Sequence, residues 1–291
     1  MAALAELRRT AAAIAEAHGL AVAAAGAHPS VLPETLPVVQ EERYLEMVRY
    51  VGPSARRQGV CGLHVHVGVP SSEACFDLLE ALLPWLPLVL ALSVNSPYLA
   101  GVENGMLSNR AQILAELPRS GVPPAFGSYE GWEAWVERLV RLGVTADYTR
   151  LWWDVRPHPR LGTLEVRMPD QPTALARTGA FVALVQALAA TLLRAPAPAA
   201  DPARRGDYLQ NRWAAARFGL DAELVHPGGE RAVRARDLAD EAFALVAPAT
   251  EELGSKALLS FSEPEAARQL EVGRAHGLEA LCADLVARSV A

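Results

Sequence analysis

The chain alternates between stretches with helical and with extended hydrophobic patterns. Apolar positions at helical spacing predict helices over residues 2–18, 41–50, 129–142 and about 172–193, and Ser71 or Ser72 can cap a further apolar helix that reaches about Val94. Short apolar or alternating segments predict strands over residues 20–25, 63–69, 151–155 and 162–168. Strands separated by long helices indicate an α+β fold rather than a doubly wound sheet.

A change of composition divides the chain. Residues 195–205 read APAPAADPARR, which is typical of a surface linker. We expect residues 1–194 to form the main functional region. Residues 206–291, with helical patterns over about 206–218, 234–253 and 264–290, are expected to form a helical C-terminal region of the same domain.

Charge and cysteine content narrow the functional classes. The 291 residues carry a formal net charge of −6, which does not match the basic surface of a nucleic-acid-binding protein. The three cysteines have no metal-ligand spacing, and the apolar runs 82–94 and 179–193 are short for membrane spans. We therefore expect a cytoplasmic protein without nucleic-acid or membrane partners. Lys256 is the only lysine, so any phosphate would be bound mainly by arginines or backbone N–H groups.

The first candidate site lies on the predicted strand 63–69, which contains HVHVG. His64 and His66 are two residues apart, so both imidazoles project from the same face of the strand. Imidazoles are common metal ligands, and the pair can serve a metal or catalytic site. The alternative is that both histidines only form hydrogen bonds in a polar layer.

The second candidate site comes from WWDVRP and GTLEVRM. Alternation places Thr163, Glu165 and Arg167 on one face of their strand, and Asp154 and Arg156 have the same spacing on the preceding strand. Taken alone, a Glu–Arg pair on a strand is usually a solvated face. Together the two strands would present carboxylates for a hard cation and guanidinium groups for phosphate, which are the groups that phosphoryl chemistry requires.

A third candidate is the segment 95–110, which ends in Ser108-Asn109-Arg110. In the functional interpretation, Arg110 clamps a carboxylate or phosphate with two parallel hydrogen bonds. In the other interpretation, the segment is only a connecting loop.

Taken in order, these motifs resemble the glutamate–cysteine-ligase-like family (type 2) of ATP-dependent carboxylate–amine ligases. The motifs are GAHP (26–29), ERY (42–44), HVHVG (64–68), NSP (95–97), SNR (108–110), WDVRP (153–157), GTLEVR (162–167), NRW (211–213) and ARFGL (216–220). The resemblance implies a glutamine-synthetase-like antiparallel sheet with helices packed on one face. It also implies that ATP, Mg²⁺ or Mn²⁺, and two small substrates bind the other face.

The resemblance also implies roles for individual residues. Glu165 would be a metal ligand, and His64 or His66 would help to hold the metal between phosphate and substrate. Arg167 would contact the ATP phosphates, with Arg110 and Arg156 as further anion contacts. The implied reaction activates a carboxylate of glutamate, or of a related acid, as an acyl phosphate. The amine of cysteine, or another amine, then attacks the acyl phosphate to form a γ-glutamyl amide.

The chain departs from the family pattern at its beginning. Family members start with a strand carrying two metal-binding glutamates in an ExE spacing, followed by a second acidic segment, and we expect this chain to lack both. Ala27 replaces a typical threonine, and Glu103-Asn104-Gly105 replaces an aspartate-led triplet. The chain could be a shortened form of a longer enzyme, or a ligand-binding remnant without activity. It could also work with a truncated site that another subunit completes. A missing edge strand would favour association into a homo-oligomer.

Two other functions remain open at this stage. The first is a catalytically inactive homologue that acts as a ligand-binding or interaction protein. The second is a metal-dependent hydrolase built on the two histidines and Glu165, for which His158 and Asp170 are the nearby additional ligands.

Overall fold

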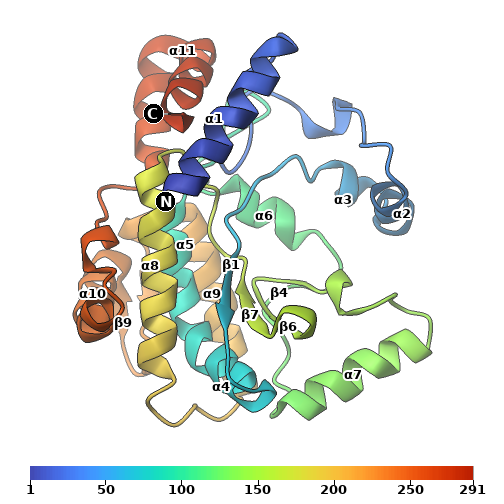
Figure 1. Ribbon diagram of the computed structural model, residues 1–291, viewed down its shortest axis with the longest axis vertical. Coiled ribbons are helices and arrows are strands. Elements are labelled where there is room, and N and C mark those ends of the chain that lie inside the picture. Colours follow the sequence, from blue (N-terminus) through green and yellow to red (C-terminus); the bar gives the residue numbers. More distant parts are fainter. Residues whose placement is uncertain (291) are drawn as a thin grey trace.

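A three-stranded antiparallel sheet in the order β1-β7-β6 lies at the centre of the computed structural model, which describes residues 1–290 (Figure 1). Its strands are β1 (Val65–Gly68), β7 (Thr163–Val166) and β6 (Val155–His158). In this register His66 of β1 and Arg156 of β6 lie opposite Glu165 of the central strand, one on each side. The register therefore brings together side chains that are far apart in sequence.

One face of the sheet packs on helices. Val65, Val155, Leu164 and Val166 belong to the main hydrophobic core, together with side chains of α4 (Ser72–Leu82), α5 (Leu86–Ser93) and α8 (Leu175–Leu192). The Ser71 side chain caps α4 by accepting from the backbone N–H of Ala74, as the sequence predicts. The α+β class, with helices covering one face of an antiparallel sheet, is confirmed.

Two helical stretches, Ser72–Ser93 and Leu175–Leu192, are long and apolar enough to cross a membrane. Each stretch is longer than the apolar run within it, because the helix begins before residue 82 in the first case and before residue 179 in the second. Within their most apolar windows, 78% and 61% of the residues are buried inside the protein. Burial in the core accounts for most of their apolar character.

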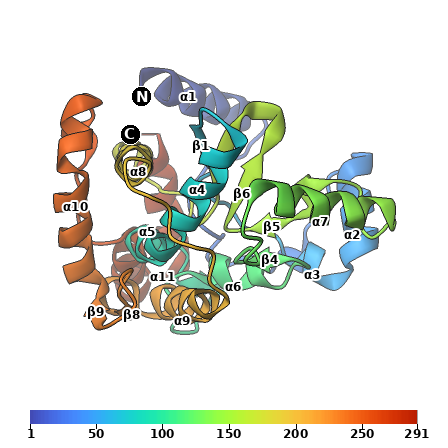
Figure 2. The same ribbon diagram turned by 90° about the horizontal axis from the view of Figure 1, so that it is seen from below.

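The remaining elements surround this centre. Figure 2 shows α10 on the outer side of α8, and α2, α3 and α7 at the opposite side of the molecule. The other helices are α1 (Ala2–Ala17), α2 (Glu42–Val51), α3 (Pro53–Arg56), α6 (Asn109–Ala115), α7 (Tyr129–Arg141), α9 (Pro202–Phe218), α10 (Ala235–Glu252) and α11 (Glu265–Ser289). Three small sheets pair β2 (Tyr98–Leu99) with β3 (Val102–Glu103), β4 (Ser120–Gly121) with β5 (Trp152–Trp153), and β8 (Glu223–Val225) with β9 (Ala232–Arg234).

Two of the predicted strands are wrong in detail. Residues 20–25 form no strand, and the nearest pairing is a single bridge between Ala27 and Val60. The predicted strand 151–155 is divided at Asp154, because β5 pairs in parallel with β4 whereas β6 pairs with β7. Pro157 and His158, expected in the connection, belong to β6.

The C-terminal region also differs from the prediction. Helix α9 begins at Pro202, inside the segment expected to be a linker, because Asp201 caps it by accepting from the backbone N–H of Ala203 and proline suits the first helical turn. Between the predicted helical stretches 206–218 and 234–253, the turn at Pro227 joins the strands β8 and β9 of a hairpin that the sequence did not predict. The strands are only three residues long, which is too short for a clear alternating pattern.

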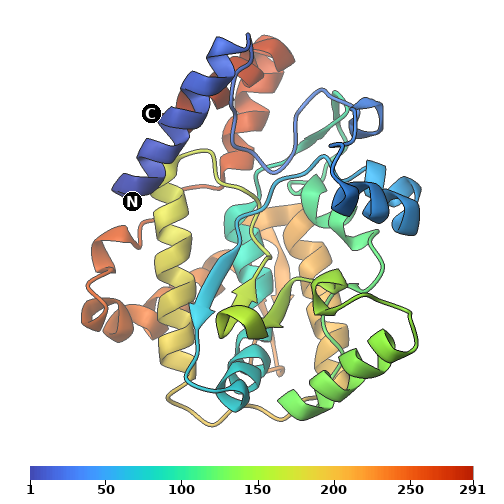
Figure 3. The same cartoon turned by 45° about the vertical axis from the view of Figure 1, so that its right-hand side comes forward.

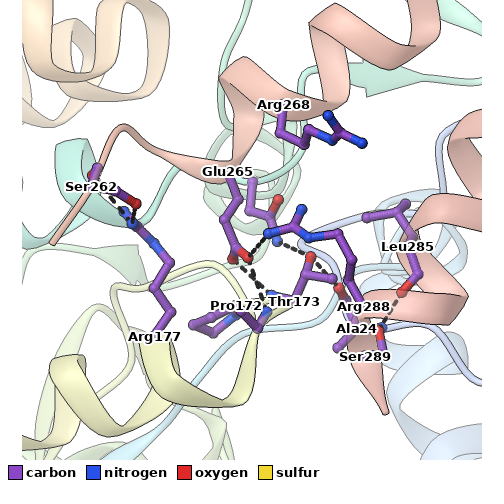
Figure 4. Close-up of polar contacts among 12 residues, drawn as sticks. Ala24, Pro172, Thr173, Arg177, Ser262, Glu265, Arg268, Leu285, Arg288 and Ser289 are labelled. Atoms are coloured by element: carbon purple, nitrogen blue, oxygen red, sulfur yellow. Dashed lines mark hydrogen bonds and ion pairs between the residues drawn. The ribbon is translucent and has the colours of Figure 1, made fainter. Parts of the chain in front are cut away.

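The two ends of the chain meet at the N-terminal end of α8. Figure 3 shows α1 and α11 at the same end of the molecule. Arg8 of α1 donates to the carbonyl oxygens of Pro172 and Ser289 at 3.1 and 3.2 Å. The Glu265 carboxylate accepts from the backbone N–H groups of Thr173 and Ala174 at 2.7 and 2.9 Å (Figure 4). The Glu265 carboxylate thus satisfies two backbone N–H donors at the start of α8.

Candidate active site

Glu165 is the centre of a polar cluster on the face of the sheet opposite the main core. Its Oε2 accepts a hydrogen bond from Nε of Arg156 at 2.7 Å, and its Oε1 accepts one from Nη1 of Arg167 at 2.7 Å. The ring nitrogens His64 Nδ1 and His66 Nε2 lie 3.2 and 3.7 Å from Oε1. The face predicted by alternation is confirmed for all four partners.

The electrostatics of the cluster follow from its burial. Burial by itself raises the pKa of Glu165, but the hydrogen bond from His64 and the charges of Arg167 and Arg156 outweigh it and hold the pKa below its usual range. Burial lowers the pKa of His64, so its imidazole is neutral at pH 7. The cluster at neutral pH is therefore one carboxylate between two guanidinium groups.

Arg167 has hydrogen-bonding capacity that its neighbours do not use. Its Nη1 donates to Glu165 and lies 3.4 Å from His64 Nδ1. Within residues 1–290, Nε is buried without a partner, and Nη2 makes no hydrogen bond. Leaving a buried donor unpaired is costly, so this guanidinium has unused capacity for a hydrogen bond, and its contact with an anion stays a prediction.

The other two predicted anion-binding arginines are more fully engaged. Arg156 donates from Nη1 to the carbonyl oxygens of Thr149 and Leu151, both at 2.8 Å, in addition to its bond with Glu165. Arg110 donates to the carbonyl oxygens of Arg167 and Met168 at 2.8 and 3.0 Å. Both therefore hold Glu165 and the end of β7 in place, and their contacts with a ligand stay predictions.

A second group of polar side chains extends the cluster along the sheet. His66 Nδ1 lies 2.9 Å from the Thr163 hydroxyl, and its ring meets that of His158 edge to face at 5.3 Å. The Tyr148 hydroxyl lies 3.5 Å from His158 Nδ1. His158 thus reaches the cluster, as the hydrolase hypothesis required.

Asp154, which we expected beside Glu165, does not join the cluster. Its carboxylate accepts from Nε of Arg212 at 2.7 Å and from the Tyr208 hydroxyl at 2.9 Å, in the interior beneath α9. The break between β5 and β6 turns Asp154 away from the cluster. Arg212 lies in the NRW motif, but nothing in the sequence indicated that Arg212 or Tyr208 contacts Asp154.

Asp170 is also occupied by structural contacts. Its carboxylate accepts from the backbone N–H of Asn95 at 2.9 Å, from the Ser96 hydroxyl at 2.7 Å and from the Ser108 hydroxyl at 2.8 Å. It is 0% exposed, and Arg110 Nη1 lies 3.7 Å away. Asp170 therefore joins the NSP and SNR segments and is not available as the additional metal ligand of a hydrolase.

A cleft of about 580 Å³ opens beside the cluster, with Arg167, His64 and Arg110 in its lining. It lies between the segment 33–60 and the sheet, and its other wall comes from α6 and β5. A second pocket of about 320 Å³ shares Tyr44, Met47 and Trp152 with the cleft and contains three further arginines, Arg43, Arg150 and Arg160. Volumes of several hundred cubic ångströms suit small-molecule ligands.

The cluster does not fit a divalent metal as it stands. Among residues 1–290, no group of three or more His, Cys, Asp or Glu side chains is arranged to hold a metal ion. Mg²⁺ prefers oxygen ligands, but both Glu165 oxygens already accept bonds from guanidinium groups. The metal-ligand roles of Glu165, His64 and His66 therefore stay predictions.

Comparisons with known proteins identify the family of this chain. The family model of Glutamate-cysteine ligase family 2 matches residues 1–262. Two curated relatives from Rubrobacter xylanophilus, named "Putative glutamate--cysteine ligase 2-3" and "2-1", are 43% and 41% identical over 88% and 86% of this chain, and the matches cover 69% and 67% of their own lengths.

A solved structure shares the fold. The crystal structure of glutamate–cysteine ligase from Francisella tularensis in complex with AMP matches with a TM-score of 0.55 and 18% identity, over 75% of this chain and 58% of that one. The likeness to this structure concerns the fold, whereas the family model and the curated relatives cover most of this sequence. On that evidence, the chain belongs to glutamate–cysteine ligase family 2.

Proposed function

We propose that this chain carries an ATP-dependent carboxylate–amine ligase site that forms a γ-glutamyl or similar amide bond. The observation that supports it most is the guanidinium of Arg167, which is 9% exposed, pairs with Glu165 and keeps two donor nitrogens unpaired beside a cleft. The structural relative was solved in complex with AMP, which supports a nucleotide as one ligand of this chain.

In the proposed reaction the γ-phosphoryl group of ATP passes to a substrate carboxylate. ADP leaves, and the amine nitrogen then attacks the acyl phosphate and displaces inorganic phosphate. Negative charge gathers on the transferred group, and a fixed guanidinium stabilises that charge without reorganising during the step. Arg167 would supply this charge through its guanidinium, whose Nη2 has no hydrogen-bond partner among residues 1–290.

The neighbours of Arg167 would keep it in position. Glu165 holds Nη1, and Arg156 holds Glu165 from the adjacent strand. Neutral His64 approaches the same carboxylate oxygen without adding charge. Glutamate or a related acid as carboxylate donor, cysteine or another amine as acceptor, Mg²⁺ or Mn²⁺ as cofactor and a cytoplasmic location remain parts of the proposal.

Thermal unfolding of the purified chain with ATP, with and without MgCl₂, tests this function. We expect ATP to raise the Tm by several degrees, because a ligand that binds only the native state stabilises it. Release of ADP on addition of glutamate with cysteine or other amines would then identify turnover. A cooperatively folded chain whose Tm does not respond to ATP would contradict the proposal and favour an inactive homologue.

A further inference from the structure

The cleft beside Arg167 has an apolar wall that the proposed phosphoryl chemistry does not require. Leu114, Leu117 and Trp152 form a small hydrophobic cluster separate from the main core, and Met47 and Val51 of α2 pack against it while partly buried. Leu114, Leu117, Trp152 and Met47 line the cleft. The prolines and aliphatic side chains of residues 33–38 add to the same lining. A ligand in this cleft would therefore bury apolar surface.

The charged residues in the lining are all basic. The described residues that line the cleft include the charged Arg56, Arg110 and Arg167 and the neutral His64, and none of them is an aspartate or glutamate. Glu165, the nearest carboxylate in the cluster, is 3% exposed and accepts from Arg167 with Oε1. An ammonium group inside the cleft would find no acidic partner and would face like charges, whereas a carboxylate would meet the unpaired donors of Arg167.

We infer that the cleft binds a carboxylate with an apolar body. The carboxylate would meet Nη2 of Arg167, next to the phosphoryl group that is transferred to it, and the chain of the acid would lie along the wall formed by Met47 and the Leu114–Leu117–Trp152 cluster. This inference rests on the proposed function only in naming the acid as the substrate that is activated. It predicts an acid donor more apolar than glutamate, whose ammonium group and second carboxylate would be desolvated against this wall.

A ligand series tests the inference with the wild-type chain and without nucleotide. Dissociation constants for acetate, butyrate, hexanoate and hexylamine can be measured by ligand-observed NMR titration at pH 7. Each buried methylene contributes about 0.8 kcal/mol, or roughly fourfold in affinity, so hexanoate, with two more methylenes, should bind roughly fifteenfold more tightly than butyrate. Hexylamine, with the same apolar chain and the opposite charge, should bind far more weakly. Equal affinity for hexanoate and hexylamine, or no effect of chain length, would overturn the inference.

A variant places the acid in the cleft. Met47→Asp adds a negative charge to the apolar wall and should weaken hexanoate binding at least tenfold, while Met47→Ala should weaken it by a smaller factor if the aspartate variant does not fold. Val102→Asp introduces the same charge at an exposed site outside the lining and should leave the affinity unchanged. Unchanged hexanoate binding in both Met47 variants would overturn the inference.

The same variants separate this inference from the proposed function. Met47→Asp should leave the ATP-induced rise in Tm in place, because the acid and not the nucleotide occupies the apolar wall. If the substitution instead removes the response to ATP and spares hexanoate binding, the cleft belongs to the nucleotide and the inference fails. If hexanoate binds as expected while ATP has no effect on wild type, the ligase proposal fails and the carboxylate site stands.

Discussion

Arg156 lies directly opposite Glu165 in the antiparallel register of β6 and β7, and its Nε donates a 2.7 Å hydrogen bond to Oε2 of that carboxylate. The other oxygen accepts from Arg167, two residues further along the chain from Glu165. A single buried carboxylate therefore keeps two arginine side chains in fixed positions. This arrangement makes Glu165 the shared anchor of both arginines.

The first prediction concerns Glu165→Ala. Removing the carboxylate leaves two buried guanidinium groups without their shared partner, so the free energy of unfolding should fall by about 3–5 kcal/mol, measured by urea denaturation. ADP release should be lost as well. Glu252→Ala, which breaks the exposed pair with Arg194, is the matched control and should change stability very little. A stable Glu165→Ala protein with normal ADP release would remove the role we assign to this residue.

The second prediction concerns Asp170→Asn. The new amide would direct a donor at groups that already donate, namely the N–H of Asn95 and the hydroxyls of Ser96 and Ser108. Because Asp170 is fully buried beside Arg110, we expect a loss of about 3–5 kcal/mol in the free energy of unfolding. Denaturant unfolding of this variant, compared with exposed Asp240→Asn, measures it. Equal stability of the two variants would show that the contacts at Asp170 are not essential.

The third prediction concerns the Cys75 thiol. Burial raises the pKa of the Cys75 thiol to about 12, from its ordinary value of 9.0. The pKa of this thiol is therefore higher in the folded chain than in the unfolded chain. The contribution of the buried thiol to the free energy of unfolding is complete below pH 9 and is lost as the pH rises from 9 towards 12. At pH 8.5 the native chain should react with iodoacetamide at exposed Cys61 and not at Cys75, as read by mass spectrometry. Reaction of both cysteines in denaturant is the control, and rapid labelling of Cys75 in the native chain would show that the site is open.

The fourth prediction concerns Arg167→Lys. Lysine keeps the positive charge but loses the planar fork of donors and the Nε that is unpaired in the wild type. The affinity for ATP, obtained from the rise in Tm, and the affinity for hexanoate should each decrease at least tenfold. Arg194→Lys, at an exposed ion pair, should retain both responses. If Arg167→Lys binds both ligands like the wild type, the anion contact lies elsewhere.

Much of the site follows from local sequence patterns. A strand alternates its side chains by geometry, so the sequence alone places His64 with His66, and Glu165 with Arg167, each pair on one face. The structure confirms both pairs and the capping of α4 by Ser71. The apolar runs that became α4, α5 and α8 likewise predict buried helices, because a helix that is apolar on every side must be covered.

The partners of these residues depend on tertiary structure. Arg167 and His64 are 103 positions apart, and no local pattern specifies the register that brings them within 3.4 Å. Asp154 shows the same limit. Alternation would place it with Arg156, but competition between β4 and β7 for the adjacent backbone turns it inward to Arg212.

The sequence by itself determined most of the helices, the strands of the central sheet with their polar face, and the family resemblance, because each of these depends on motifs that are local along the chain. Tertiary structure alone decided that Asp170 joins two distant loops, that Arg167 keeps unpaired donors and that Met47 of α2 lines one cleft together with Trp152. These features arise from packing between segments that are distant in sequence. The free energy of such packing comes from many contacts together, and a local sequence pattern does not specify them.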